Sequence, residues 1–204
     1  MRASKNEGLV RYRIRAAMIS VILGLSLVVS SSAATASQTK LSSELLSVTQ
    51  MPSGWSTDVQ TGGSSPGCLA HLFEPLGTKQ TSSATVNFVY NGNLPLVSEK
   101  LGTYSNAKTA YKKIVATLAG CKRVTGVSGS QKVTGTVGKL KTPHYGDASA
   151  AYAVKLVIQG TSIGNDIIIV RKGSVVMGME EANPPPVNMS QLQRLVAKAL
   201  VKIS

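Results

Sequence analysis

The feature that most limits how this chain can fold is a run of four branched apolar residues, Ile167-Ile168-Ile169-Val170, within the segment 163–172. Side chains of a strand alternate between the two faces of a sheet, so this run places apolar groups on both faces. Such a strand is stable only where both faces of the sheet are covered. We therefore predict a central strand at 163–172, with other parts of the chain packed on each side of it.

Shorter segments around this run alternate between apolar and polar residues and are separated by turn residues. Asn91-Gly92-Asn93 is typical of a hairpin turn, and Gly160 and Gly173 separate later segments. Strands joined by such short turns pair in antiparallel fashion. A short extended piece is expected at Trp55, followed by seven strands at 83–90, 96–104, 122–127, 131–141, 148–159, 163–172 and 174–181.

Apolar residues at helical spacing predict two long amphipathic helices, at 106–119 and 189–203. Ser105 is expected to cap the first helix and Asn188 to start the second. A third, short helix is predicted at Leu41–Val48. The fold class is therefore α+β: a single antiparallel β-sheet domain with helices packed against it.

Residues 1–36 have the three parts of a secretory signal peptide. A basic stretch precedes an apolar run of 14 residues, Ala16 to Val29, and small residues then lead to the cleavage pattern Ala34-Thr35-Ala36. This run is shorter than the roughly 20 residues of a membrane span, so a retained anchor is the weaker alternative. We predict a secreted, extracytoplasmic domain of residues 37–204, preceded by a signal peptide and without a stable membrane span after cleavage.

The mature chain is basic, with 17 Lys and Arg residues against eight Asp and Glu residues once residues 1–36 are removed. A net charge near +9 favours anionic partners in the cell envelope. The lysines are spread along the sequence, which also fits an ordinary solvated surface. Nucleic acid is not an expected partner, because the chain has no arginine-rich stripe and few aromatic residues for base stacking.

The chain has two cysteines, Cys68 and Cys121. In an exported protein these are expected to form a disulfide, which would close a loop of 54 residues. The chain-entropy estimate for such a crosslink is about 4 kcal/mol. A reactive or metal-binding thiol pair is the alternative.

Motifs for catalysis are weak in this sequence. The segment 160–164 matches the G-x-S-x-G pattern of hydrolases, but that pattern needs a helix after the serine, and a strand is expected here. We interpret the segment as a hairpin turn and keep a hydrolase using Ser162, with His144 and Asp147, as a minor alternative. His71 and His144 lie far apart in sequence, so no metal site is expected, and no cofactor motif is present.

Candidate ligand-binding residues are aromatic or polar residues at the ends of elements, because binding residues concentrate in loops. The candidates are Trp55, Tyr104, His144, Tyr145 and Asp147. The turn from His144 to Asp147 is the first choice, whereas Trp55 is more typical of a core position under a loop. The acidic pair Glu180-Glu181 is set aside, because neighbours in a strand point to opposite faces.

Several segments, in this order and spacing, resemble the PknH-like extracellular domain family, which comprises exported sensor-type domains of actinobacteria. They are Leu45–Trp55, Cys68, Thr103–Cys121, Gly146-Asp147 with Ala151-Tyr152, and Arg171-Lys172-Gly173. The resemblance spans residues 41–203. It implies an α+β sandwich-like domain with a cleft for an unidentified ligand, no enzymatic activity, and a family disulfide between Cys68 and Cys121. The second disulfide, the kinase domain and the membrane anchor of the kinase sensor are not expected here.

These observations predict a non-enzymatic, sensor-like domain of the cell envelope that binds a small molecule or an envelope fragment. The alternative is an interaction protein that docks an envelope partner through a sheet edge or through its basic surface. The residues do not indicate which ligand is bound, nor the oligomeric state.

Overall fold

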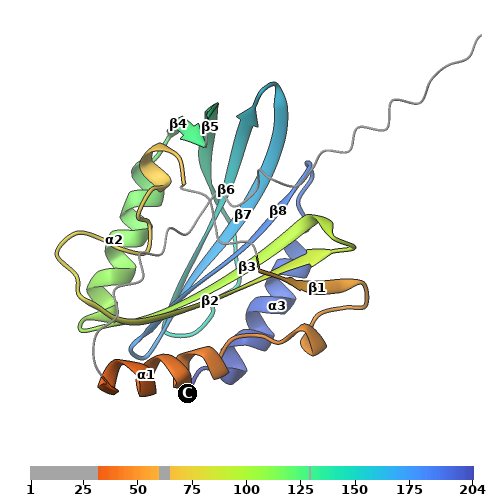
Figure 1. The fold of residues 1–204 in the computed structure, drawn as a ribbon. Helices are drawn as coiled ribbons and strands as arrows, with labels where there is room; N and C mark the ends of the chain where they lie inside the picture. Colours follow the sequence, from red (N-terminus) through yellow and green to blue (C-terminus); the bar gives the residue numbers. More distant parts are fainter. Residues whose placement is uncertain (1–31, 60–64, 129) are drawn as a thin grey trace, which may run out of the picture.

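The computed structural model describes residues 32–59, 65–128 and 130–204 of the 204-residue chain. These residues form three α-helices and one eight-stranded antiparallel sheet (Figure 1). The helices are α1 (Ser32–Ser43), α2 (Ala107–Gly120) and α3 (Met189–Lys202). The strands are β1 (Trp55–Asp58), β2 (Gln80–Tyr90), β3 (Asn93–Tyr104), β4 (Arg123–Ser128), β5 (Gln131–Leu140), β6 (Ala148–Ile158), β7 (Thr161–Lys172) and β8 (Val175–Asn183). The predicted α+β fold, with helices packed against a single antiparallel sheet, is confirmed.

The predicted signal peptide, residues 1–36, lies almost entirely outside the described residues, so export stays a prediction. Among the helices of the described part of the chain, none combines the length and the apolar character needed to cross a membrane.

The strand order is β1-β2-β3-β8-β7-β6-β5-β4. Two groups of sequential strands are therefore joined where β3 pairs with the last strand, β8. The predicted central run Ile167–Val170 belongs to β7, between β6 and β8, and its four side chains are buried. Because α2 packs on one face and α3 on the other (Figure 1), the prediction of a strand covered on both sides is confirmed.

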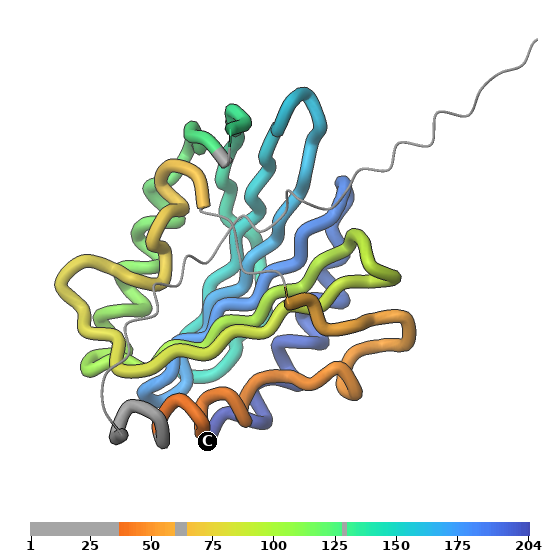
Figure 2. Tube along the Cα trace, in the orientation of Figure 1, coloured from red at the N-terminus to blue at the C-terminus, as the bar shows by residue number. Residues whose placement is uncertain are grey.

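Each face of the sheet has its own hydrophobic core, which we name by its helix. The α2 face is also covered by the segment 65–79, which contains the 3-10 helix η2 (Gly67–Leu69) and runs beside α2 (Figure 2). The predicted disulfide Cys68–Cys121 is present and ties this segment to the end of α2. The α3 face is covered by α3 and by side chains from residues 41–55.

Asparagines cap both long helices. In α2, Oδ1 of Asn106 accepts a hydrogen bond from the N–H of Thr109 at 3.0 Å, so the cap is Asn106 and not Ser105 as predicted. In α3, Oδ1 of Asn188 accepts from the N–H of Gln191 at 3.1 Å, as the predicted helix start requires.

The helix predicted at Leu41–Val48 is wrong in its extent. Helix α1 ends at Ser43, and Leu45 and Leu46 are buried without being helical; the short 3-10 helix η1 (Val48–Gln50) follows. The physical reason is a tertiary hydrogen bond. A carboxylate oxygen of Glu99, a buried residue of β3, accepts from the N–H of Leu46 at 2.7 Å, so this N–H is satisfied outside a helix.

Candidate functional site

Four polar side chains lie in the apolar centre of the sheet, on the α2 face. They are Ser98 and Lys100 of β3, Asn165 of β7 and Glu180 of β8, each no more than 6% exposed. The register places Ser98 directly opposite Glu180, and alternation along β3 puts Lys100 on the same side. We call these residues the central polar cluster. Buried charged groups are uncommon and costly, so the cluster needs an explanation.

An aromatic residue from outside the sheet covers this cluster. Phe73, in the segment 65–79, points the Cζ end of its ring at Gly178 of β8, where a Cβ would overlap the ring. The ammonium nitrogen of Lys100 lies 5.2 Å from the centre of the same ring, a cation–π contact. We call Phe73 and its neighbour Leu72 the plug, because they close the cluster off from solvent.

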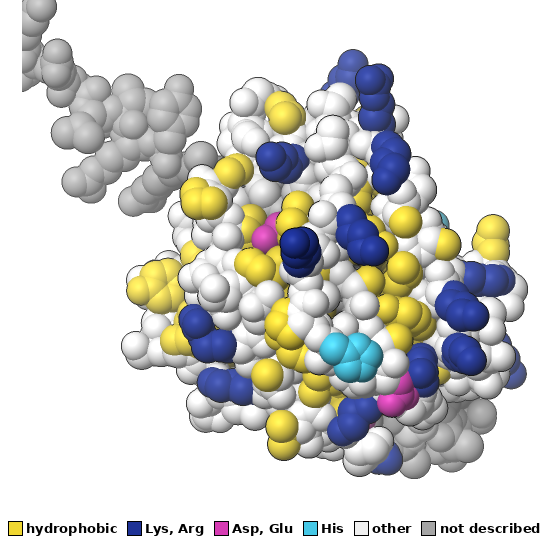
Figure 3. All heavy atoms as spheres, turned by 180° about the vertical axis from the view of Figure 1, so that it is seen from behind, with side chains coloured by type: hydrophobic (Ala, Val, Ile, Leu, Met, Phe, Trp, Pro, Cys, Tyr) yellow, Lys and Arg dark blue, Asp and Glu magenta, His cyan; other side chains and the backbone are white. Residues whose placement is uncertain are grey.

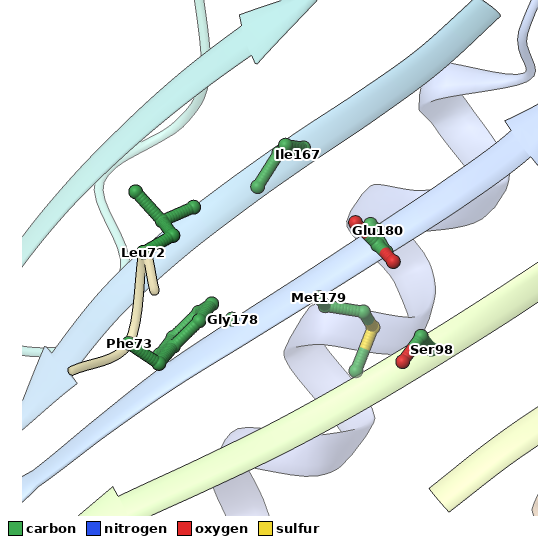
Figure 4. A pocket seen from close by; sticks show the side chains of 7 residues that line it. All are labelled: Leu72, Phe73, Ser98, Ile167, Gly178, Met179 and Glu180. Carbon is green, nitrogen blue, oxygen red and sulfur yellow. The ribbon is translucent and has the colours of Figure 1, made fainter. Parts of the chain in front are cut away.

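A small cavity remains between the plug and the sheet (Figure 4). Its volume is about 10 Å³, room for the centre of about one water molecule. It is lined by Leu72, Phe73, Ser98, Ile167, Gly178, Met179 and Glu180. Its walls are therefore mainly apolar, with the Ser98 hydroxyl and the Glu180 carboxyl as its polar groups.

Hydrogen bonding in the central polar cluster is incomplete. Nδ2 of Asn165 donates to Oε2 of Glu180 at 3.2 Å. Among the described residues, neither Oδ1 of Asn165 nor Oγ of Ser98 has a hydrogen-bond partner. Leaving a buried polar atom unpaired costs about 1–3 kcal/mol. A hydrogen bond to either of these oxygen atoms, from water or from another donor, would therefore be favourable.

Burial changes the protonation of both charged groups in the cluster. It raises the pKa of Glu180 to about 8, against the opposing effects of the Asn165 hydrogen bond and the charge of Lys100. Burial lowers the pKa of Lys100 to about 8, and the nearby charges of Glu74 and Glu180 oppose this shift. At neutral pH the carboxyl is mainly neutral and the amine mainly charged, so the cluster carries about one positive charge.

The α3 face buries carboxylates of its own. Burial raises the pKa of Glu99 to about 7, while its hydrogen bond from Leu46 and the charge of Lys202 oppose the shift. Glu181 lies opposite Asp166 in the register between β7 and β8, and burial raises its pKa to about 7 as well. This face has no plug, because the covering groups here are α3 and the segment that Glu99 binds.

The predicted site residues lie in different places. Tyr104, at the end of β3, is the one beside the plug: its hydroxyl donates to the carbonyl oxygen of Phe73 at 2.6 Å. Trp55 of β1 is buried in the core of the α3 face, with its ring 5.8 Å from that of Tyr90. Trp55 and Tyr104 are thus on opposite faces and near opposite ends of the sheet.

The loop residues His144, Tyr145 and Asp147 lie together, away from the central polar cluster. Asp147 forms a 2.7 Å ion pair with Arg171 and accepts from the N–H of Gly173. The hydroxyl of Tyr145 donates to a carbonyl oxygen of α3, and His144 is exposed. These contacts fasten the loop to its neighbours, and a ligand-binding role for the loop stays a prediction.

The serine of the G-x-S-x-G pattern lies in a hairpin. Gln159 and Gly160 have φ of 50° and 81°, as a two-residue hairpin turn requires, and β7 follows. Ser162 and His144 flank opposite ends of the 11-residue strand β6, roughly 30 Å apart. They therefore form no catalytic pair. Within the described residues, no group of three or more His, Cys, Asp or Glu side chains is placed to hold a metal.

The central polar cluster was missed from the sequence. Ser98 and Lys100 sit in a strand that was predicted, and Glu180 belongs to the acidic pair that was set aside. Glu180 and Glu181 do point to opposite faces, as expected, but each face then buries one of them. The available signal was a charge between apolar residues within a strand; the partners of that charge come from other strands.

No protein-family model and no curated protein matches this sequence. Among solved structures, the chain is similar to the extracellular domain of PknH from Mycobacterium tuberculosis, with a TM-score of 0.58 and 13% sequence identity. The match covers 81% of this chain and 95% of that domain. The predicted PknH-like fold is thereby supported by the structure, whereas at this identity the likeness shows the fold alone and not a sequence family.

Proposed function

We propose that this chain is an exported, non-enzymatic domain of sensor type, which binds a small molecule at the central polar cluster after the plug moves aside. The observation that carries the proposal is the pairing of unsatisfied buried polar atoms with a cavity, beneath a cover that belongs to neither a helix nor a strand. A protein that needed only a stable core would do better with apolar residues at these positions. Similarity in fold to the extracellular domain of PknH fits this role.

The chemistry of the site defines the ligand class. Moving the Phe73 ring off Gly178 would open an apolar slot beside Leu72, Ile167 and Met179. At its base, Lys100 and the neutral carboxyl of Glu180 donate hydrogen bonds, while Ser98 and Asn165 accept them. A small amphipathic molecule with one negative or neutral polar head, such as a short fatty acid or an aromatic acid, matches this arrangement.

Thermal unfolding with octanoate and benzoate as probes, and glucose as a control, tests the proposal. A probe at about 100 times its dissociation constant adds about 2.7 kcal/mol, which raises Tm by about 5 °C or more in a domain of this size. We expect one of the acids to do so and glucose to have no effect. Absence of a shift above about 1 °C with either acid would contradict this ligand class.

Substitutions in the central polar cluster test whether the acid binds there. Glu180→Met and Ser98→Ala should each weaken the binding of the effective acid about tenfold, measured by calorimetry, because each removes a hydrogen-bonding group. Glu99→Met is the matched control, because Glu99 neighbours Ser98 in β3 but points to the α3 face. Equal losses in Glu180→Met and Glu99→Met would show that binding occurs elsewhere or depends on stability alone.

A further inference from the structure

The α3 face is not covered over its whole width. Helix α3 contacts β7 and β8, whereas most outward side chains of β4, of β5 and of the second half of β6 remain exposed. The polar ones are Arg123, Thr125, Lys132, Thr134, Thr136 and Lys155. We call this area the open sheet face.

Strand alternation places these side chains on one side. Their neighbours along each strand, including Val124, Val133 and Leu156, are buried in the core of the α2 face. The register sets Arg123, Thr136 and Lys155 in one row across three strands. Adjacent strands are about 4.8 Å apart, so the row spans roughly 10 Å, and the next row along the strands lies roughly 7 Å away. The result is a regular array of cations and hydroxyls.

The array carries one sign of charge. Strands β4, β5 and β6 contain no Asp or Glu residue. Within the described residues, none of Arg123, Lys132 and Lys155 takes part in an ion pair. A face that served solubility alone would more commonly mix both signs.

The protein surface as a whole is more basic than its composition suggests. Half of the eight acidic residues between 37 and 204 are buried, namely Glu44, Glu99, Glu180 and Glu181. Only one of the 17 basic residues in that range, Lys100, is buried. Figure 3 shows the consequence from behind: Lys and Arg side chains outnumber Asp and Glu on the visible surface.

The edge of the sheet beside the array is blocked. Gly67 packs so closely on β4 that a Cβ at this position would overlap the carbonyl oxygen of Thr125, and Pro66 lies against Gly126. The disulfide of Cys68 holds this segment in place. A partner therefore meets side chains of the open sheet face and not the backbone groups of an edge strand.

We infer that the open sheet face binds a linear acidic polysaccharide, through its cations and threonine hydroxyls. The row of cations and hydroxyls extends across three strands, which suits an extended chain better than a small molecule. It has no aromatic side chain on which nucleic-acid bases could stack. Its large apolar side chains, Val127 and Val157, are 62% and 40% exposed and too few to insert into a lipid bilayer. This inference concerns a surface separate from the central polar cluster and does not depend on the ligand proposed there.

Binding to polygalacturonate, a linear polymer of carboxylate-bearing sugars, tests the inference, with neutral dextran as the control polymer. Titrations at 50 and 150 mM salt give the affinity and its salt dependence. The triple variant Arg123→Gln, Lys132→Gln, Lys155→Gln should bind at least about tenfold more weakly, with a shallower salt dependence. The matched variant Lys79→Gln, Lys108→Gln, Lys112→Gln removes the same charge from exposed positions elsewhere and should lose less than about threefold.

A single added charge gives an independent measurement. Thr136→Glu places a carboxylate between Arg123 and Lys155 and should weaken binding about fivefold or more, whereas Thr117→Glu on α2 should have little effect. Equal losses in the two triple variants would overturn the inference, because net charge alone would then explain binding. Absence of binding at 50 mM salt, or tighter binding to phosphatidylglycerol vesicles or single-stranded DNA, would also overturn it.

Discussion

Each face of the sheet buries a glutamate near its centre, Glu99 on the α3 face and Glu180 on the α2 face, but the surroundings of the two carboxyl groups differ. On the α3 face, Glu99 accepts a hydrogen bond from Leu46, and Lys202 beside it donates to the carbonyl oxygen of Leu45. Among the described residues, Oε1 of Glu99 has no hydrogen-bond partner, and the Ser98 hydroxyl beside Glu180 has none either. What distinguishes the α2 face is the cavity that Glu180 and Ser98 border.

The difference teaches that burial of a charge does not by itself indicate a binding site. Glu99 fastens the segment 44–51 to the sheet, so its cost is offset by a hydrogen bond that fixes the chain. The groups around Glu180 leave acceptors unpaired beneath the plug, which belongs to neither a helix nor a strand. The five predictions that follow test this contrast, from the largest expected effect to the smallest.

Removing the disulfide should have the largest effect, and it should act on the α2 face and not on the α3 face. Cys68→Ser with Cys121→Ser is expected to lower the free energy of unfolding by about 4 kcal/mol, measured by urea denaturation. Hydrogen exchange in the native state should then rise in the segment 65–79 and stay unchanged in the segment 44–51. Equal increases of hydrogen exchange in both segments would contradict the difference between the two faces.

Stability should fall as pH rises from about 5 to 8. The pKa values of Glu99 and Glu180 are raised in the folded state, so the folded protein holds protons that the unfolded chain has released. Glu99→Gln or Glu180→Gln should each remove about 2–3 kcal/mol of this fall, measured by denaturation across pH.

Stability should rise again at higher pH, and this rise should come from Lys100 on the α2 face alone. The pKa of Lys100 is lowered to about 8, so between about pH 8 and its ordinary value of 10.5 the unfolded chain holds the extra proton and stability rises with pH. Lys100→Met should abolish the recovery, and Glu99→Gln should leave it intact. A recovery that persists in Lys100→Met would contradict this assignment.

Adding a methyl group at Gly178, beneath the plug, should destabilise the α2 face. Gly178→Ala places a methyl group against the Phe73 ring and should cost about 1–3 kcal/mol in thermal unfolding. Gly138→Ala is the matched control, because a Cβ there meets nothing within 4 Å. If both variants unfold at the same temperature, Phe73 does not rest on Gly178 as described.

The loop at 144–147 should contribute least. Asp147→Asn breaks an ion pair whose carboxylate is 45% exposed, so a loss of about 0.5–1 kcal/mol is expected. His144→Ala, at an exposed neighbour, is the control and should be neutral. A larger effect of either change on ligand binding than that of Glu180→Met would move the candidate site to this loop.

The sequence predicted the fold well where the signal was local. The turn at Asn91 and Gly92 has the positive φ values that a hairpin needs, and the apolar run in β7 is central as expected. The prediction was wrong at Leu45 and Leu46, where a carboxylate 53 positions away overrides the helical pattern. Such an override leaves no trace in local periodicity.

The site could not be predicted in the same way. Ser98, Asn165 and Glu180 come from three strands, and only the pairing of β3 with β8 and of β8 with β7 brings them together. Alternation within a strand tells which side chains share a face, but not which residues of another strand lie opposite. Nor does it show that Phe73, outside the sheet, covers them.

The pairing of β3 with β8 also has a consequence for how the chain reaches its native state. The first three strands can complete their side of the sheet only when the last strand has been made, and contacts such as Lys202 with Leu45 span 157 positions. A chain with such distant contacts folds slowly, because loop closure must precede the gain from pairing. Were the chain exported, as its sequence predicts, this delay would be useful, because a sheet that closes late would leave the polypeptide unfolded until its C-terminus had crossed the membrane.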